Sequence, residues 1–282
     1  MSEESRKSII YDKKISFQRT PYKRQGVYRN VINYLNDGNE LISIVNARIT
    51  PGPRRIRLPV EADLRYERWG FSEIIDASCI KEMFSQYQWK PRDFACSPHG
   101  RDASPDRCGE IQRELQKTID DYLATADGQV EKTIYRMIGE RLTAYIESGN
   151  TNDLLGLLGF GPGLTPLGDD VLLGLLLCKN ELDYDPQTNK MIAEASQIKT
   201  LPISSSFLKS VCEREYSDDY SEFLDDVFRK GTLQKSSLQK ILDYGATSGY
   251  GILIGFTTML DKYIKEGSEN GKTGKDTRKQ LF

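Results

Sequence analysis

The spacing of apolar residues changes from a strand pattern to a helix pattern near residue 108. Between residues 27 and 69, short runs of β-branched and aromatic residues are separated by turn residues, which is typical of strands. Three such runs, over residues 31–35, 41–45 and 55–58, predict strands. Asp37 and Gly38 lie between the first two runs, and Asp-Gly in this place favours a hairpin turn. The pattern therefore predicts a β-rich N-terminal unit.

After residue 108, apolar residues recur at steps of three and four, which predicts helices. We expect these helices over residues 111–123, 132–146, 191–198, 206–229 and 236–243. The serines at 204–206 are interpreted as an N-cap cluster, with a place in a ligand pocket as the alternative. Strands followed by helices indicate an α+β fold: a β-rich N-terminal unit and then a mainly α-helical domain with a buried central helix.

Changes in composition predict the domain boundaries. Residues 1–26 are polar and basic, and we expect them to form an arm. Residues 27–107 form the β-rich domain and a linker, and residues 108–265 form the helical domain. Residues 266–282 are polar and contain glycine, which predicts a disordered tail.

The most informative stretch runs from residue 159 to residue 178. Its first part, residues 159–165, is rich in glycine and is called the first glycine loop below. Thr165 followed by Pro166 predicts the N-cap and first residue of a helix, which is apolar on every side and so should be buried on every side. Backbone N–H groups beside a helix N-terminus favour a phosphate or carboxylate. The candidate ligand-binding residues here are Gly161, Gly163, Thr165 and Gly168.

Two carboxylates, Asp169 and Asp170, fall in the first turn of this helix and are the candidate catalytic residues. One interpretation is that they offset the helix dipole and accept hydrogen bonds from the loop. The other is acid/base chemistry or the binding of a hard cation, because a buried carboxylate needs a partner. We predict no cofactor, and the sequence leaves a divalent cation at these carboxylates open.

A second segment has the same form, with a loop of small residues leading into an apolar helix. This second glycine loop, residues 245–251, supplies Thr247, Ser248 and Gly249 as candidate ligand-binding residues. We predict that the two glycine loops face one another across a pocket. The alternative is that their glycines, like Gly255 further along, only let helices pack closely.

Composition narrows the class of partner. The 282 residues carry 39 basic and 41 acidic side chains, so a net charge of -2 gives no reason to expect nucleic acid. No stretch predicts a membrane span or a signal peptide. Five cysteines without a C-x-x-C pair suit a reducing cytoplasm. The chain has a single histidine, His99, and this count excludes a histidine-rich metal site. We expect His99 in an exposed loop.

Three motifs resemble those of a known family. They are G-x-G-x-x-x-T-P-x-G-D-D-x-L-x-G from residue 159, T-S-G-x-x-x-L-x-G from residue 247, and N-D-G-N-E-L-I-S-I with P-G-P-R-R-I-R-L in the N-terminal part. Together they look like the family, long labelled only as a domain of unknown function, that includes the small (AllH-like) subunit of oxamate carbamoyltransferase. The sequence departs from that family at Leu167, where serine is usual, and at Ala246, where histidine is usual.

The resemblance implies a transferase that converts oxalurate and phosphate to oxamate and carbamoyl phosphate in purine (allantoin) breakdown, together with other enzyme subunits. A phosphate would then bind at Gly161 and Gly163, and a substrate carboxylate would need a guanidinium, for which Arg54, Arg55 and Arg57 are the candidates. The alternative for these arginines is an ordinary solvated strand edge. A non-catalytic subunit that binds a small anion or a nucleotide, or a purely structural subunit, remains the alternative function.

Overall fold

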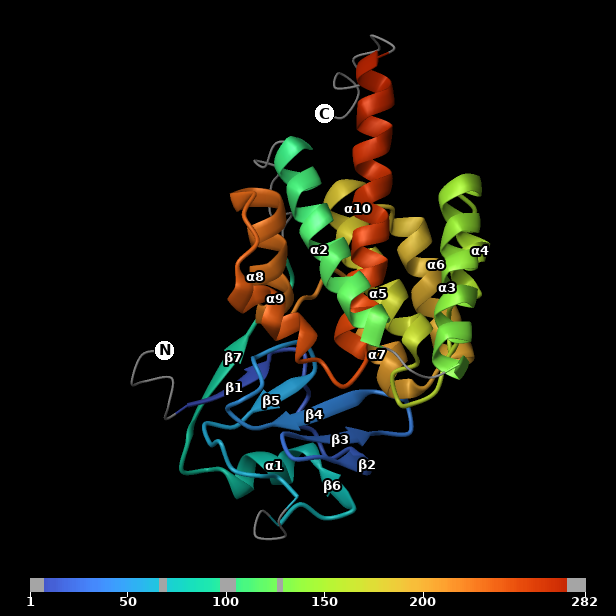
Figure 1. The fold of residues 1–282 in the computed structure, drawn as a ribbon. Coiled ribbons are helices and arrows are strands. Elements are labelled where there is room, and N and C mark those ends of the chain that lie inside the picture. The colour runs from blue at the N-terminus through green and yellow to red at the C-terminus, as the bar shows by residue number, and fades with distance from the viewer. Residues whose placement is uncertain (1–7, 66–69, 97–104, 126–128, 273–282) are drawn as a thin grey trace. The chain divides into compact units, whose positions relative to one another are not determined.

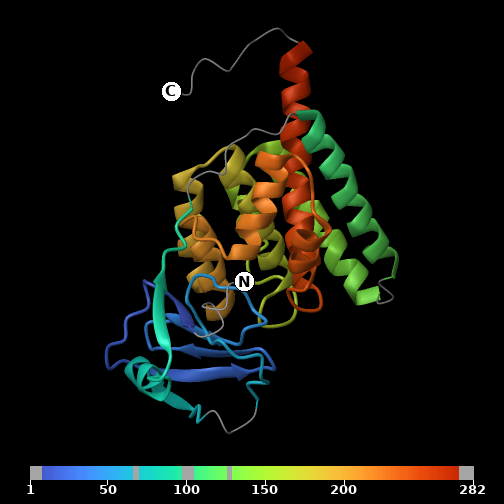
Figure 2. The same ribbon diagram turned by 90° about the vertical axis from the view of Figure 1, so that its left-hand side faces the viewer.

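A computed structural model describes residues 8–65, 70–96, 105–125 and 129–272 of the chain. The chain forms two compact units: residues 1–96 together with 215–218, and residues 97–214 together with 219–282. The strands and helix α1 (Ala77–Met83) belong to the first unit, and the long helices belong to the second (Figure 1, Figure 2). This division confirms the predicted α+β class, with strands ahead of helices in the chain.

The first unit, called the β-rich unit, contains a seven-stranded sheet. Its strands are β1 (Ser8–Asp12), β2 (Pro21–Val27), β3 (Val31–Leu35), β4 (Leu41–Val45), β5 (Arg55–Arg57), β6 (Ile74–Asp76) and β7 (Gln88–Arg92). They lie in the order β6-β2-β3-β4-β5-β1-β7. The pairs β4–β5 and β1–β7 are parallel, and the others are antiparallel. Because side chains alternate along a strand, Ile32, Ile44 and Ile56 all enter one core.

The hairpin between β3 and β4 is confirmed. Leu35 pairs with Leu41 across the two strands, and Asn36 N–H donates to the carbonyl of Glu40. Asn39 takes the left-handed conformation, with φ 59°, which asparagine tolerates better than most residues. The turn residues therefore fix the register in which the apolar side chains of both strands reach the core.

The prediction of a polar arm over residues 1–26 is wrong where the structure describes it, from residue 8 on. Strand β1 pairs with β5 and β7, and β2 pairs with β3 and β6. Tyr22 is buried in the core while Lys23 and Gln25, its neighbours in β2, are exposed. A half-buried strand needs an apolar residue only at alternate positions. The basic residues at the other positions therefore masked the alternating strand pattern in the sequence.

The second unit, called the helical unit, holds nine α-helices among the described residues. They are α2 (Pro105–Thr125), α3 (Gln129–Ser148), α4 (Thr151–Leu155), α5 (Leu167–Leu182), α6 (Pro186–Lys199), α7 (Pro202–Cys212), α8 (Asp218–Leu224), α9 (Lys235–Leu242) and α10 (Ser248–Lys272). A π-helical segment, Asp225–Lys230, continues α8. Helix α10 packs along α5 and also contacts α2 and α9, and α7 packs against both α5 and α6 (Figure 1).

The burial of α5 confirms the predicted central helix. All 16 of its residues are buried, including polar ones near its C-terminal end. The buried amide of Asn180 is satisfied by hydrogen bonds. Its Nδ2 donates to the carbonyl of Val211 at 2.9 Å, and its Oδ1 accepts from Asn189 at 2.8 Å. An all-round apolar helix is stable in water only when neighbours cover every face, and here α7 and α10 supply part of that cover.

Two glycines let the backbones of α5 and α10 touch. A Cβ at Gly174 of α5 would overlap the carbonyl oxygen of Ile252, and a Cβ at Gly255 of α10 would overlap the carbonyl oxygen of Val171. The contact is therefore reciprocal, one glycine from each helix. For these two glycines the close-packing interpretation of the small residues holds.

The predicted helix over residues 206–229 is wrong, because the chain leaves the helical path between α7 and α8. Arg214 takes a left-handed conformation with φ 57°, and Glu215 bridges to Ala95. The residues at 204–206 are likewise not an N-cap cluster, since α7 begins at Pro202 and contains them. The apolar spacing continued through the break, so periodicity alone did not reveal it.

Residues 215–218 form a clip that belongs to the β-rich unit. Tyr216 N–H donates to the carbonyl of Phe94 at 3.1 Å, and Asp218 N–H donates to the carbonyl of Pro51 at 3.2 Å. The Asp218 carboxylate also accepts two bonds from the Arg92 guanidinium, at 2.6 and 2.8 Å. The β-rich unit is therefore made from two separate parts of the sequence.

The predicted tail begins too early, since α10 continues through residues 266–272. The rest of that prediction, residues 273–282, and the expected loop around His99 lie outside the described residues. In the part of the chain that the structure describes, no helix is long and apolar enough to cross a membrane.

We predict that Gly174→Ala and Gly255→Ala each destabilise the protein by about 1–3 kcal/mol or more, because the added methyl group forces two backbones apart. Gly139→Ala in α3 is the matched control, since nothing lies within 4 Å of a Cβ there. Its higher helix propensity should raise the free energy of unfolding by up to about 1 kcal/mol. Urea denaturation of the three variants measures the effect, and equal stability of all three would contradict the close contact.

Candidate functional site

The first glycine loop leads into the buried helix by a tight turn. Gly159, Gly161 and Gly163 have φ of 72°, 115° and 101°, a region that favours glycine. A Cβ at Gly159 would overlap the carbonyl oxygen of Lys199, whereas a Cβ at Gly163 would meet nothing within 4 Å. Gly159 is therefore needed for packing, and the space beside Gly163 is open.

The predicted cap at Thr165 is wrong by one residue. The N-cap position is Pro166, which has extended ψ and no side-chain cap bond, and α5 begins at Leu167. The hydroxyl of Thr165 instead lies 3.0 Å from the hydroxyl of Ser248 in the second glycine loop. Thr165 is thus used to join two loops rather than to cap a helix.

Asp169 is held by hydrogen bonds from three segments. Its Oδ1 accepts from the Gly159 N–H at 2.8 Å, and its Oδ2 accepts from the hydroxyls of Thr200 and Ser204, the latter at 2.7 Å. Burial raises the pKa of Asp169, and these three hydrogen bonds oppose that rise. This geometry favours the first interpretation for Asp169, in which the carboxylate fastens the loop to its surroundings.

Asp170 has a different environment, although it is the next residue. The residue is 5% exposed, and its Oδ2 has no hydrogen-bond partner among the described residues. Burial raises the pKa of Asp170 to about 7, while a hydrogen bond with the Ser248 side chain lowers it and the charge of Asp169 adds to the rise. A buried carboxyl that is half ionised near neutral pH can either donate or accept a proton.

The two glycine loops meet at this point, as predicted. Besides the contact between Thr165 and Ser248, a Cβ at Gly251 would press against Asp170 and the Leu167 side chain. The Ser248 hydroxyl therefore lies between Thr165 and Asp170, and Ser248 is partly exposed while Asp170 is buried. The hydroxyls of Thr165 and Ser248 thus connect the two loops to the buried carboxyl of Asp170. A pocket shared by the loops stays a prediction.

The other candidates in the loops have mainly backbone roles. Gly249 N–H donates to the carbonyl of Tyr244 at 2.9 Å, and a Cβ at Gly249 would overlap the carbonyl oxygen of Ile241. Gly168 N–H donates to the carbonyl of Phe160 at 2.8 Å, so this amide is already used. Thr247 is exposed. Anion binding at this helix start would therefore depend on the amides of the loop itself.

No group of three or more histidine, cysteine or acidic side chains that could hold a metal ion occurs among the described residues. None of the five cysteines is joined in a disulfide in the part of the chain that the structure describes. Burial raises the pKa of Cys178 well above its usual value and that of Cys212 to about 12. At neutral pH these two thiols are protonated, which makes them poor nucleophiles and poor metal ligands.

The interpretation of Arg55 and Arg57 as a solvated strand edge is wrong. Strand β5 lies inside the sheet, between β4 and β1. Arg57 is 4% exposed and donates from Nε and Nη2 to the carbonyls of Ile49 and Ala47, at 2.8 and 2.7 Å. Arg55 donates to the carbonyl of Thr50 at 3.1 Å. Both guanidiniums thus fasten the chain that precedes β5, and a role of Arg55 toward a ligand stays a prediction.

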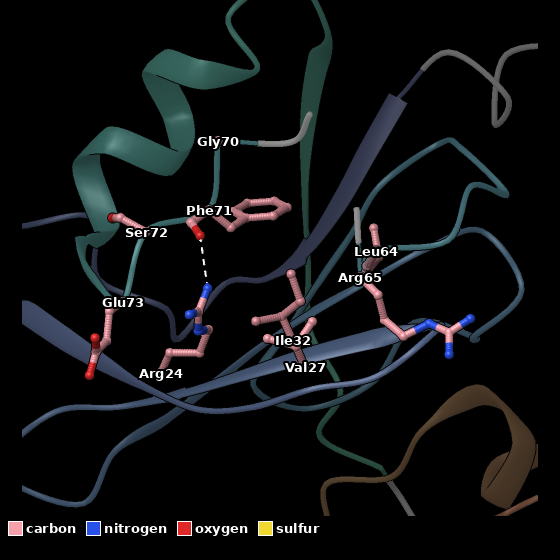
Figure 3. Close-up of a pocket in the computed structure, with 9 residues that line it drawn as sticks. All are labelled: Arg24, Val27, Ile32, Leu64, Arg65, Gly70, Phe71, Ser72 and Glu73. Atoms are coloured by element: carbon pink, nitrogen blue, oxygen red, sulfur yellow. Dashed lines mark hydrogen bonds between the residues drawn. The ribbon is translucent and has the colours of Figure 1, made fainter. Parts of the chain in front are cut away.

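The β-rich unit contains a cavity of about 620 Å³. Figure 3 shows the Arg24 guanidinium directed at the carbonyl of Phe71, to which it donates at 3.0 Å. The other lining residues are Val27, Ile32, Leu64, Arg65, Gly70, Ser72 and Glu73. None of the candidate site residues lines this cavity.

Sequence reasoning missed the roles of Thr200 and Ser204 as donors to Asp169. The signal was present in the small polar residues that precede an apolar stretch, and it was read as a helix cap. The alternative, that these serines lie at the ligand site, is closer to the structure because Ser204 directly contacts Asp169. Local helix chemistry cannot distinguish a serine that caps its own helix from one that bonds another helix.

No curated protein and no solved structure matches the chain. Residues 157–260 match the model of a family described as oxamate carbamoyltransferase subunit AllH. The matched part includes both glycine loops, all of α5 and the two carboxylates. The match confirms the resemblance that the motifs predict: over residues 157–260, the chain is similar to the family of the oxamate carbamoyltransferase subunit AllH.

Proposed function

We propose that the chain is a subunit of a carbamoyltransferase-like enzyme and binds a small anionic substrate, a phosphate or carboxylate compound, where its two glycine loops meet. The reaction would connect oxalurate and phosphate with oxamate and carbamoyl phosphate, in purine (allantoin) breakdown in the cytoplasm. The observation that carries the proposal is Asp170, a buried carboxyl with one unpartnered oxygen inside the family-matched region. Leaving a buried carboxyl oxygen without a donor costs free energy, so such an atom needs an explanation.

Asp170 is the candidate for proton transfer. Its pKa near 7 is matched to an acid or base that works at neutral pH. The free Oδ2 can accept a hydrogen bond from an N–H of a carbamoyl or ureido group, and the carboxyl can take up or return the proton when a C–N bond breaks. Ser248, partly exposed above it, would orient that group. Asp169 would act as a positioning residue, because its bonds hold the loop and not a ligand.

The open space at Gly163 supports a ligand beside the first glycine loop, since a close approach of phosphate oxygens needs backbone without a side chain. The family name refers to a subunit, so we expect other enzyme subunits as partners. The second candidate function is a non-catalytic subunit that binds a small anion. It is favoured by the full hydrogen bonding of Asp169 and by the packing roles of several glycines.

The two carboxylates should respond oppositely to mutation. The pKa of Asp170 rises from 3.8 to about 7 on folding, so its stability contribution is complete below pH 4 and is lost as the pH rises through 7. At about 1.4 kcal/mol per pH unit, the ionised group costs at most about 4 kcal/mol. Asp170→Asn should therefore be more stable than the wild type at pH 8 and about equal to it at pH 4.

Asp169→Ala serves as the comparison, because it leaves the Gly159 N–H and two hydroxyls without their acceptor. It should lower stability by about 1–3 kcal/mol at both pH values. Urea denaturation at pH 4 and pH 8 gives the free energies of unfolding. If Asp170→Asn is destabilised at pH 8, the carboxyl has a structural partner, and the argument for a functional group at this position fails.

Ligand binding tests the proposal itself. Thermal melts with phosphate, carbamoyl phosphate or oxamate should show stabilisation of about 2.7 kcal/mol at a ligand concentration of 100 times Kd. Asp170→Asn should lose this response, while Asp183→Asn should keep it, because Asp183 is exposed at the far end of α5. With partner subunits present, Asp170→Asn should lower turnover about a hundredfold or more. If the wild type and both variants respond equally to the ligand, Asp170 has no part in ligand binding and only its role in packing remains.

A further inference from the structure

We propose that the rings of Tyr11, Phe17 and Trp89 form a binding site for a small quaternary ammonium ligand on the β-rich unit. Tyr11 lies in β1, Trp89 lies in β7, and Phe17 lies in the loop between β1 and β2. Since β1 and β7 pair in parallel, with Ile9 opposite Trp89 and Tyr11 opposite Pro91, the Tyr11 and Trp89 side chains share one face of the sheet. We call these three rings the aromatic cage.

The three rings pack edge to face against one another, beside the core of the β-rich unit. The ring centroids are 5.2 Å apart for Tyr11 and Phe17, 5.8 Å for Tyr11 and Trp89, and 5.4 Å for Phe17 and Trp89. The interplanar angles are 77°, 65° and 86°, so each ring is steeply inclined to the other two. All three residues are partly exposed, which leaves ring surface accessible from solvent.

A cation already occupies the aromatic cage. The Lys81 Nζ lies 4.8 Å from the ring centroid of Phe17 and 5.9 Å from the centroids of Tyr11 and Trp89. All three distances are within the roughly 6 Å at which ring faces attract a cation. Lys81 is exposed, and its ammonium has no hydrogen bond or ion pair with any residue that the structure describes. Only ring faces hold it, so the position of Nζ marks a cation site.

The aromatic cage is fixed before any ligand arrives. Trp89 Nε1 donates to the carbonyl of Phe84 at 3.2 Å, which sets the orientation of the indole ring. Phe84 directly follows α1, the helix that carries Lys81. The same short helix therefore fixes one wall and supplies the resident cation. A site whose walls need no rearrangement loses little entropy on binding.

The chemistry of the walls favours an alkylated ammonium over a bare one. Ring faces attract positive charge but donate and accept no strong hydrogen bonds, so they cannot replace the water around a lysine ammonium. A trimethylammonium group is more weakly hydrated and also buries methyl groups against the rings. It should therefore displace Lys81, whose flexible side chain can return to solvent. This inference rests on residues of the β-rich unit alone and does not depend on the proposed function.

Trp89 provides the measurement, because the chain has only two tryptophans, Trp69 and Trp89. In full-length protein with Trp69→Phe, titration with tetramethylammonium or choline should give a saturable change in the fluorescence of Trp89. Adding Lys81→Ala removes the competing cation and should tighten binding about tenfold, and adding Phe17→Leu should weaken it about tenfold. Lys90→Ala, the matched control on β7, should bind as the parent does.

The neutral carbon isostere of choline, in which a tert-butyl group replaces the trimethylammonium, distinguishes a cation site from an apolar groove. It should bind at least about tenfold more weakly than choline. Equal binding of both compounds would overturn the proposal, as would the absence of any fluorescence response in the Lys81→Ala variant while its circular dichroism remains that of the parent. Much tighter binding of a trimethyllysine peptide than of choline would overturn the assignment to a small ligand.

Discussion

The backbone contact between α5 and α10 determines the geometry of the candidate site. Because Gly174 and Gly255 have no side chains, each helix rests directly on a carbonyl of the other. The first glycine loop immediately precedes α5, and the second runs into the first turn of α10, which begins at Ser248. The contact therefore also brings these two segments together, and Thr165 reaches Ser248. The same contact presses Gly251 against Asp170 and removes that carboxyl from water. The elevated pKa of Asp170 is thus a consequence of helix packing.

Two carboxylates at adjacent positions of one helix turn can have opposite effects on the stability of the fold. Successive residues of an α-helix point about 100° apart, so Asp169 turns toward donors from the first loop and α7 while Asp170 turns toward α10. Asp169 meets three donors, which offset much of its desolvation. Asp170 meets a glycine and one serine, which offset little. A protein commonly retains such a destabilising group only where function needs it, and the packing of the surrounding core then offsets the lost stability.

The sequence predicted those features that depend on local pattern and missed those that depend on long-range pairing. The buried helix, the β3–β4 hairpin and the meeting of the glycine loops follow from periodicity, turn residues and repeated motifs. Strand β1 was missed because its short apolar run stands alone between Lys7 and Lys13, and β2 was missed because Tyr22 is followed by Lys23 and Arg24. Both strands are recognisable only in their sheet. Asp169 and Asp170 were indistinguishable in sequence, since their difference depends on Thr200, Ser204 and Gly251, which are distant along the chain.

The clip at residues 215–218 gives the chain an interleaved order of assembly. The β-rich unit lacks its bonds to Phe94, Pro51 and Arg92 until residue 218 has been synthesised, long after its last strand at residue 92. The chain must also leave the helical unit and return to it within a few residues, at a point fixed by the left-handed Arg214. Neither unit can therefore finish folding as an isolated stretch of sequence. The β-rich unit is complete only when residues 215–218 have joined it, so its assembly depends on a segment that is synthesised after residues 97–214 of the helical unit.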